Sequence, residues 1–423
     1  MKWKKIVLIF LTAILINNNS LFAATDDLGH EQKKVAAPAA KAQALFKEFS
    51  IPTPYSQPFK IAVDKNGIVW FTEQGNNALG KFDPKTTKFS EYKLPSAKGA
   101  DTARWGFSET DRKAFTGGFS VSSVGSLAGI AIDSRGDIWF AELLGNKIGR
   151  FSPAKEEFSE YSIPTTDSGP YNIAIDSKGD VWFTERNANK IGRFTIAAST
   201  FKEYSIPTPN SKPAGIAVDQ RDNVWFTLSD TNKIGMLESQ TGNITEYNIL
   251  TPTANPYDIA IDSKGNVWFT ELSANKLGMY SPQMKRFDEA VVPTTSSVPL
   301  GLAIDKYDRI WFTENRGNKI GLFDPASAVF KEHDIPTTQS LPIGIAVSPS
   351  GDIWFVEGER EANRIGFIEG QAAAPPEKAH SAKSEDSGRK SWQKWNIIIL
   401  IGGIVITGLI LYLAASSRKR DKR

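Results

Sequence analysis

Short stretches of alternating hydrophobic and polar residues run through most of the chain. Residues 179–185, GDVWFTE, alternate as a half-buried β-strand does. A short apolar run, PYNIAID (170–176), precedes them, and NKIGRF (189–194) and FKEYSIP (201–207) follow. The links between these segments have the length of hairpin turns. None of the segments has the apolar spacing of three and four residues that a helix needs, so the pattern predicts four strands per unit.

A Trp-Phe pair marks this unit seven times. The tryptophans are Trp70, Trp139, Trp182, Trp225, Trp268, Trp311 and Trp354. The last six are 43 residues apart, and the first interval is longer by an insertion of 26 residues. A strand-rich repeat of this length is typical of a β-propeller with one blade per repeat. The sequence therefore predicts an all-β, seven-bladed β-propeller with four-stranded blades over residues 45–369.

The copies of the outer-strand motif are shifted by one repeat relative to the blades. The motif occurs once before the first blade, as FKEFSIP (46–52), and no copy follows the seventh Trp-Phe pair. We therefore expect the N-terminal strand 46–52 to supply the outer strand of the last blade. This closure would join the two ends of the chain in one sheet and remove the open edge of the ring.

Several polar residues recur around the ring and are expected to do the same local job in each blade. An Asp ends the inner strand in six repeats, an Asn precedes the third strand in all seven, and a Gly follows that Asn three residues later. We expect the Asp to cap the next turn by an Asx-type hydrogen bond rather than to bind calcium. We expect the Asn and the Gly to set the turn into the third strand, and the Trp-Phe pairs to pack blade against blade.

A glutamate follows the Trp-Phe pair in six repeats, and the fourth repeat has Leu228 instead. The six are Glu73, Glu142, Glu185, Glu271, Glu314 and Glu357. One interpretation is that each carboxylate binds backbone N–H groups of a neighbouring blade or loop. The other is a ring of carboxylates that faces a ligand, so the six are candidate ligand-binding residues.

Function is expected where the repeat breaks. The insertion, residues 96–124, links the outer strand of blade one to the inner strand of blade two, which places it on the same face as the glutamates. It carries Arg104, Trp105 and Phe107, which are candidate ligand-binding residues. Long loops in compact folds are often functional, although this one could also merely cover the ring. Blade seven breaks the pattern on the same face, with two extra residues in EGEREAN (357–363).

The N-terminus predicts export. Residues 1–24 have the basic, apolar and polar order of a signal peptide, with cleavage near Ala23 or Ala24. An uncleaved membrane anchor is the alternative. Residues 25–44 form a polar spacer.

The C-terminus predicts a membrane anchor. Residues 370–395 are rich in Ala, Pro, Ser and charge, as a flexible stalk is. Residues 396–415 are uncharged and long enough to span a bilayer as a single transmembrane helix, with a buried core helix as the alternative. The basic tail 416–423 is expected in the cytoplasm. The propeller would then be displayed on the extracytoplasmic side of the cell membrane.

Composition narrows the possible chemistry. The 423 residues include no cysteine and three histidines, of which only His333 falls in the repeats. Disulfides, thiolate metal sites and Cys nucleophiles are therefore excluded, and so is a metal site built from several histidines. The formal net charge is +3, part of it in the tails, which argues against a nucleic-acid partner.

The motif set P-x-G-I-A-x-D, VWFTE, NKIG-R and EY-x-I-P-T resembles the streptogramin B (virginiamycin B) lyase family over about residues 45–369. The resemblance implies a seven-bladed propeller. It also implies an enzyme that linearises a cyclic depsipeptide antibiotic by elimination, using a magnesium ion and a histidine base.

The positions that the resemblance implies for catalysis hold other residues here. The family's histidines follow the proline that opens the inner strand of late repeats, and the matching positions are Leu300 and Ile343. Leu341 takes the place of a carboxylate, and Phe59 that of a tyrosine. Only a glutamate near the last Trp-Phe pair has a match, Glu357. An elimination needs a positioned base, so the usual machinery is absent.

Three functions follow as hypotheses. The first is a non-catalytic binding or scaffold module for an envelope or extracellular peptide, glycan or protein, with no cofactor required. The second is a lyase that opens cyclic depsipeptides, or a hydrolase, with Mg²⁺ held by carboxylates; Glu314 and Glu357 are then the candidate metal ligands and Glu357 the candidate catalytic residue. The third is a purely structural envelope component, for which the insertion would be dispensable.

Overall fold

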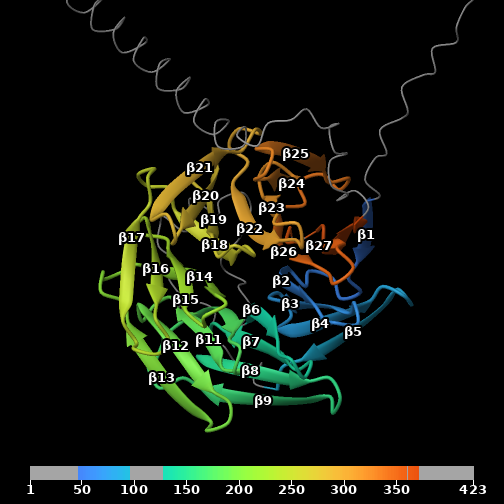
Figure 1. Cartoon of the computed structure of the whole chain (residues 1–423). Coiled ribbons are helices and arrows are strands. Elements are labelled where there is room, and N and C mark those ends of the chain that lie inside the picture. The colour runs from blue at the N-terminus through green and yellow to red at the C-terminus, as the bar shows by residue number, and fades with distance from the viewer. Residues whose placement is uncertain (1–45, 96–126, 360, 371–423) are drawn as a thin grey trace, which may run out of the picture. The chain divides into compact units, whose positions relative to one another are not determined.

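The computed structural model describes residues 46–95, 127–359 and 361–370, and these form 28 β-strands in seven four-stranded sheets. The sheets are arranged in a ring (Figure 1). Every sheet is antiparallel, with neighbouring strands paired in sequence order except at the closure. The all-β, seven-bladed propeller with four-stranded blades is thus confirmed. The transmembrane segment predicted at 396–415 lies outside the described residues, and within them no helix has the length and apolarity to cross a bilayer.

Each blade has the same four strands, counted from the centre outward. The inner strands are β2 (Pro58–Val63), β6 (Leu127–Ile132), β10 (Pro170–Ile175), β14 (Pro213–Val218), β18 (Pro256–Ile261), β22 (Pro299–Ile304) and β26 (Pro342–Val347). The second strands are β3 (Val69–Glu73), β7 (Ile138–Glu142), β11 (Val181–Glu185), β15 (Val224–Leu228), β19 (Val267–Glu271), β23 (Ile310–Glu314) and β27 (Ile353–Glu357).

The third strands are β4 (Ala78–Asp83), β8 (Lys147–Ser152), β12 (Lys190–Thr195), β16 (Lys233–Leu237), β20 (Lys276–Ser281), β24 (Lys319–Asp324) and β28 (Arg364–Ile368). The outer strands are β5 (Lys88–Lys93), β9 (Glu157–Ser162), β13 (Thr200–Ser205), β17 (Ile244–Asn248), β21 (Arg286–Val291), β25 (Val329–Asp334) and, for blade seven, β1 (Phe46–Ser50).

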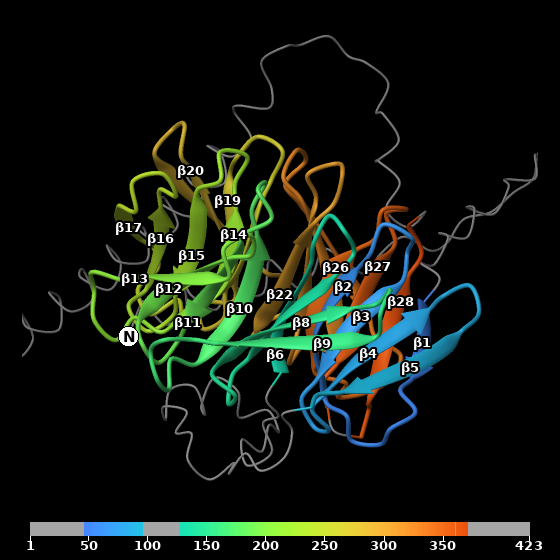
Figure 2. The same cartoon turned by 90° about the horizontal axis from the view of Figure 1, so that it is seen from below.

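The N-terminal strand closes the ring as predicted. β1 pairs antiparallel with β28, from Phe46 opposite Ile368 to Ser50 opposite Arg364, and the two lie side by side in the turned view (Figure 2). The amide of Thr337, in blade six, donates to Glu48 Oε1 at 3.0 Å. The first strand of the chain therefore holds the last blade and also reaches its neighbour.

Aromatic side chains form the core between blades. Trp139 stacks on Tyr161 of its own outer strand, with ring centroids 6.0 Å apart, and contacts Phe194 of blade three at 6.0 Å. Equivalent contacts occur around the ring, such as Trp70 with Tyr92 and Phe151. The predicted blade-to-blade packing of the Trp-Phe pairs is confirmed.

The repeated Asp caps its turn as predicted and also binds the repeated Trp. Asp176 Oδ1 accepts hydrogen bonds from the amides of Lys178 and Asp180 at 3.0 and 2.9 Å, which is the Asx pattern. Its Oδ2 accepts from Trp182 Nε1 at 2.9 Å. Five blades make this second bond, at Trp139, Trp182, Trp225, Trp268 and Trp311. The carboxylate thus ties the turn to the buried core.

The repeated Asn sets its turn, but the repeated Gly has another role. Asn189 has a left-handed φ of 57°, donates to the carbonyls of Ile206 and Thr208, and accepts from the amide of Ser211. Gly192 is not left-handed, because it pairs within the strand opposite Phe183. A Cβ there would lie 2.1 Å from the Phe183 ring. The prediction that Gly shapes the turn is therefore wrong: it makes room for a core aromatic ring.

Candidate functional site

The strand directions define two faces of the ring. On one face, called the upper face here, the inner strands begin and the second strands end, so that Pro170 lies opposite Glu185. The opposite, lower face carries the Asp-capped turns. The links from outer to inner strands, including the position of the insertion, open on the upper face.

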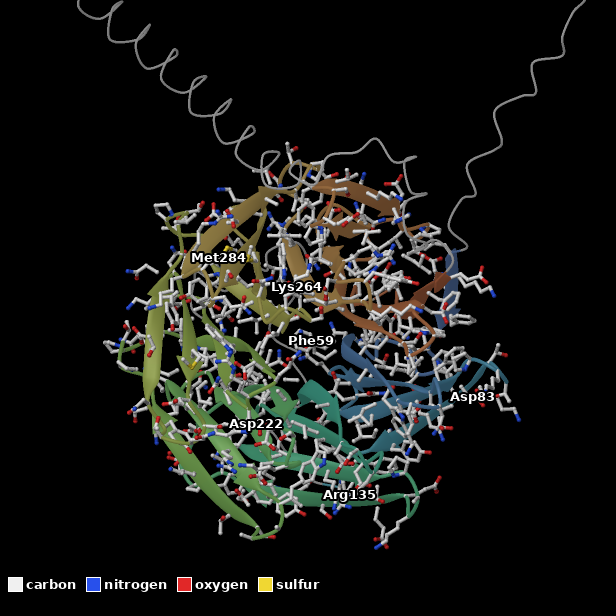
Figure 3. The ribbon with its side chains drawn as sticks, in the orientation of Figure 1. Phe59, Asp83, Arg135, Asp222, Lys264 and Met284 are labelled. Carbon is white, nitrogen blue, oxygen red and sulfur yellow. The ribbon has the colours of Figure 1, made fainter. Side chains whose placement is uncertain are left out.

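Apolar side chains close the upper end of the central channel. They occupy the second position of each inner strand: Phe59, Ala128, Tyr171, Ala214, Tyr257, Leu300 and Ile343. None is more than 5% exposed, and Phe59 lies at the centre of the ring (Figure 3). The hydroxyls of Tyr171 and Tyr257 are hydrogen-bonded to each other. Burial and the neighbouring Tyr171 raise the pKa of Tyr257 well above its usual range, so this cluster stays uncharged.

A buried ion pair crosses the channel beside this cluster. Lys60 Nζ of blade one lies 2.7 Å from Asp258 Oδ2 of blade five, and the two side chains are 12% and 10% exposed. Asp258 Oδ2 also accepts from the amide of Leu302 in blade six at 3.1 Å. The third polar side chain at this level is Asn172. Blades that are not neighbours in the ring are thus joined through its centre.

Sequence reasoning missed these polar residues, although a signal was available. They occupy the third position of the inner strand, where four of the seven repeats have glycine: Gly129, Gly215, Gly301 and Gly344. The space at the glycine positions is narrow, because a Cβ at Gly215 would lie 2.5 Å from the carbonyl oxygen of Tyr257. Lys60, Asn172 and Asp258 break that consensus, and the break could have been found by comparing the repeats with one another.

We expect Lys60→Met to lower the free energy of unfolding by about 3 kcal/mol, since it leaves Asp258 buried without its counter-charge. The double variant K60M/D258N should lose less than the single variant, because no uncompensated charge remains. The control is Lys264→Met, which removes an exposed ion pair with Asp308 and should cost under about 1 kcal/mol. Chemical denaturation measures all three; equal losses for K60M and K264M would contradict the prediction.

The six glutamates lie inside the blades and not on the upper face. All six are 0% exposed. A Cβ on Gly278, in the third strand, would lie 2.6 Å from Glu271 Oε1, so the carboxyl group extends outward over that glycine. Beyond it stands Glu289 of the outer strand, which is bound to Lys276 Nζ at 2.6 Å. A ligand on the upper face would not reach such a carboxyl group, so the predicted ligand-binding role has no support from this placement.

Burial also changes the protonation of these glutamates. It raises the pKa of Glu73, Glu185, Glu271 and Glu357 to about 8 and that of Glu314 to about 7, and the negative charge of the outer-strand glutamate adds to the effect. No backbone N–H group donates a hydrogen bond to the carboxyl oxygens of these five within the described part of the chain. The prediction that they bind backbone N–H groups is therefore wrong. The cause lies in the glycine of the third strand. Because this glycine has no side chain, the glutamate side chain turns into the space above it.

The two candidate metal ligands do not converge. Glu314 and Glu357 lie in adjacent blades, and each faces the outer-strand glutamate of its own blade, Glu332 and Glu48. Over residues 46–95, 127–359 and 361–370, no group of three or more His, Asp or Glu side chains could hold a metal ion. These residues do not fit a carboxylate-held magnesium ion.

The structure describes only some of the other residues that the sequence analysis singled out. Arg104, Trp105 and Phe107 lie outside the described residues. His333 lies in β25, where it stacks on Trp311 with centroids 6.1 Å apart. Burial lowers the pKa of His333. This histidine occupies the position that a tyrosine holds in four of the other outer strands. It is a core residue of blade six.

A pocket of about 710 Å³ opens on the upper face between blades six and seven. Its charged lining residues are Arg316, Glu359, Glu361 and Arg364. Glu359 is tied into its own loop, where it accepts from the amide of Ala362 at 2.9 Å. The pocket therefore coincides with the stretch in which blade seven departs from the repeat. Charged side chains and side-chain amide groups line it.

Fold and site together define a class: a seven-bladed β-propeller closed by its N-terminal strand, with an apolar cluster across the upper end of its channel and a polar pocket beside it. Residues 116–309 match the model of the virginiamycin B lyase family. A streptogramin B lyase structure is 31% identical and matches with a TM-score of 0.66, over 77% of this chain and 97% of that one. The chain belongs to the virginiamycin B lyase family.

Two further structures are similar. One is a catalytically inactive virginiamycin B lyase from Staphylococcus aureus, carrying a histidine-to-alanine substitution, with quinupristin; it is 30% identical with a TM-score of 0.66, over 77% of this chain and 99% of that one. The other is the extracellular domain of the hybrid two component system BT4673 from B. thetaiotaomicron, which is 17% identical with a TM-score of 0.57, over 79% of this chain and 44% of that one. The second shows likeness of fold alone. None of the curated proteins compared with the chain matches it.

Proposed function

We propose that this chain is a non-catalytic, extracytoplasmic binding module of the virginiamycin B lyase family, anchored in the cell membrane by the C-terminal segment 396–415. Its ligand would be an envelope or extracellular peptide, glycan or protein, and it would need no cofactor. The signal peptide 1–24 and the basic tail 416–423 support this orientation by their charge pattern.

One observation carries the proposal. The positions at which the family resemblance implies catalytic histidines hold Leu300 and Ile343, which are 2% and 1% exposed inside the apolar cluster that closes the channel. A general base must reach its proton and have a suitable pKa, and neither side chain can accept a proton. In the described part of the chain, the carboxyl groups whose pKa is raised to about 7 or 8 belong to glutamates that are sealed inside the blades.

The upper pocket is the surface that supports binding. It is open, it is lined by charges of both signs, and it lies on the face where the insertion joins the ring. Gln339 and Arg316 are exposed at its rim. Recognition surfaces commonly sit on the loops of a rigid scaffold.

Catalysis is tested by incubating the full-length chain in detergent with a streptogramin B-type cyclic depsipeptide, with magnesium and separately with chelator. Mass spectrometry follows the ring, and we expect no opening above the rate without protein. Magnesium-dependent opening by a folded sample would overturn the proposal in favour of the lyase alternative, and Glu357→Gln would then be the first variant to assay.

Binding is tested by placing a photo-crosslinking residue at Gln339 on the upper face and, as a matched control, at Lys264 on the lower face. Both positions are exposed. In cells that display the protein we expect a discrete crosslinked product from position 339 and none from position 264. Equal products at both positions, or none at either, would count against a binding role for the upper face.

A further inference from the structure

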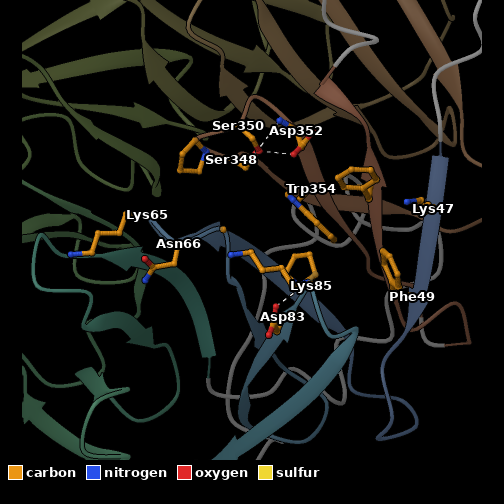
Figure 4. A pocket seen from close by; sticks show the side chains of 14 residues that line it. Lys47, Phe49, Lys65, Asn66, Asp83, Lys85, Ser348, Ser350, Asp352 and Trp354 are labelled. Carbon is orange, nitrogen blue, oxygen red and sulfur yellow. Dashed lines mark hydrogen bonds between the residues drawn. The ribbon is translucent and has the colours of Figure 1, made fainter.

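A second pocket, of about 420 Å³, lies on the lower face at the seam where blade seven meets blade one (Figure 4). It is called the seam pocket here. Its lining combines lysines, two aspartates, serines and aromatic residues, among them Trp354, Phe367 and Phe49. The seam is also where the two ends of the ring are joined, because β1 supplies two of the lining residues, Lys47 and Phe49.

Blade seven lacks the carboxylate that binds the repeated tryptophan in five other blades. In those blades the indole N–H donates to an Asp Oδ2 at 2.9–3.2 Å. Ser348 replaces the Asp in blade seven, and its Oγ accepts from the amide of Asp352 at 2.9 Å, which still caps the turn. No hydrogen bond among the described residues involves Trp354 Nε1, and the indole nitrogen is directed into the pocket (Figure 4).

A contact that joins neighbouring turns at two other seams is missing here. Ser177 donates its hydroxyl to Asp222 at 2.7 Å between blades three and four, and Ser263 does the same to Asp308 between blades five and six. The matching positions at the seam are Pro349 and Gly67. Neither has a side chain that can make this bond, so no such contact crosses the pocket.

The three lysines that line the pocket outnumber its two aspartates, so the lining carries a net positive charge. Its aspartates are engaged by their own loops: Asp83 Oδ1 accepts from the amide of Lys85 at 2.9 Å, and Asp352 Oδ1 from the amide of Gly370 at 2.7 Å. Lys47, Lys65 and Lys85 are exposed at the rim. An anion in the pocket would therefore meet an N–H donor from the indole and ammonium groups from the rim.

We propose that the seam pocket binds a small organic carboxylate with an apolar body, in which the carboxylate accepts the Trp354 indole N–H and pairs with Lys85, and the body lies against Phe49 and Phe367. The repeat itself selects this ligand chemistry, since a carboxylate oxygen is the partner of the same indole in five other blades. The site is on the face opposite the proposed upper-face ligand, so the two inferences stand independently.

The test uses the full-length chain in detergent, labelled with 5-fluorotryptophan and observed by ¹⁹F NMR. Benzoate is the probe, and benzamide is its uncharged counterpart of the same shape. We expect benzoate to shift the Trp354 resonance saturably, with a Kd of about 1 mM, as suits one charged contact in an open pocket. Benzamide should bind at least about tenfold more weakly. Trp354→Phe assigns the resonance by its disappearance.

Two variants make the result specific. Ser348→Asp restores the carboxylate of the other blades, and we expect it to weaken benzoate binding at least about tenfold in a protein that still melts cooperatively. Lys85→Gln should weaken binding about three- to fivefold, whereas Lys264→Gln, a lysine elsewhere on the lower face, should leave it unchanged.

Three results would overturn the proposal. They are an absence of any shift at Trp354 up to 10-fold above the expected Kd of about 1 mM, equal binding of benzoate and benzamide, and undiminished binding by the Ser348→Asp variant. Inorganic phosphate is a further arm of the titration. Phosphate that shifts Trp354 more strongly than benzoate would show an anion site of a different class and would also reject the carboxylate assignment.

Discussion

Removing β1 is expected to abolish the folded propeller. A chain that begins after Ser50 loses a strand of five residues that pairs with β28 and leaves that strand as an open edge. It also loses Phe49, whose ring lies 4.6 Å from Phe82 of blade one and 6.0 Å from Trp354 of blade seven. The lost hydrogen bonds and the lost apolar burial together amount to roughly 5–10 kcal/mol, which is comparable to the whole stability of a typical domain.

The matched control begins at residue 45, directly before β1, and should retain cooperative unfolding. Circular dichroism and thermal melting compare the two truncations. The shorter chain should give no cooperative transition, or a Tm lower by at least about 15 °C together with aggregation through the exposed edge. Similar melting curves for both chains would mean that β1 is not the element that holds the ring closed.

The second large effect is a loss of stability as the pH rises from about 4.5 to about 8. Below pH 4.5 the buried glutamates are protonated in the folded and the unfolded chain alike. Between the ordinary pKa of 4.5 and the raised value of about 8 for Glu271, the unfolded chain releases the proton and the folded chain keeps it. Ionisation then stabilises the unfolded state but not the folded state, so the free energy of unfolding falls across this pH window.

Five glutamates share this behaviour, with raised pKa values of about 7 to 8. A shift of one pKa unit in one group corresponds to about 1.4 kcal/mol, so even partial shifts add up to several kcal/mol. We expect the Tm at pH 8 to be lower than at pH 5 by at least about 5 °C. A Tm that rises with pH over this range would contradict the buried, protonated state.

The chain offers its own control for this effect in blade four. Leu228 occupies the glutamate position there, and the outer network remains, with Lys233 Nζ 2.7 Å from Glu246 Oε2. Glu271→Leu should therefore fold, leave stability at pH 5 little changed, and raise the Tm at pH 8. Glu157→Leu, at an exposed glutamate of an outer strand, should not reduce the dependence on pH.

The sequence was sufficient to predict the architecture, because the same signals recur in repeat after repeat. The Trp-Phe pair with its period of 43 residues predicted the blades, and the displaced FKEFSIP motif predicted the closure by β1. The Asp caps and Asn turns were also predictable, since they depend on residues a few positions apart. Local signals of this kind do not depend on how the blades are placed around the ring.

The sites depended on contacts between residues far apart in the chain. Whether Glu271 faced the channel or the outer strand was decided by the space over Gly278, and the pairing of Lys60 with Asp258 required the ring to bring blades one and five together. Likewise, Ser348 leaves Trp354 without a carboxylate, but only the meeting of blade seven with blade one turns that lack into a pocket. The sequence alone determined what each blade is, because a blade is built from neighbours in the chain. The tertiary structure decided what the blades enclose, because burial and charge pairing there arise between strands that only the closed ring brings together.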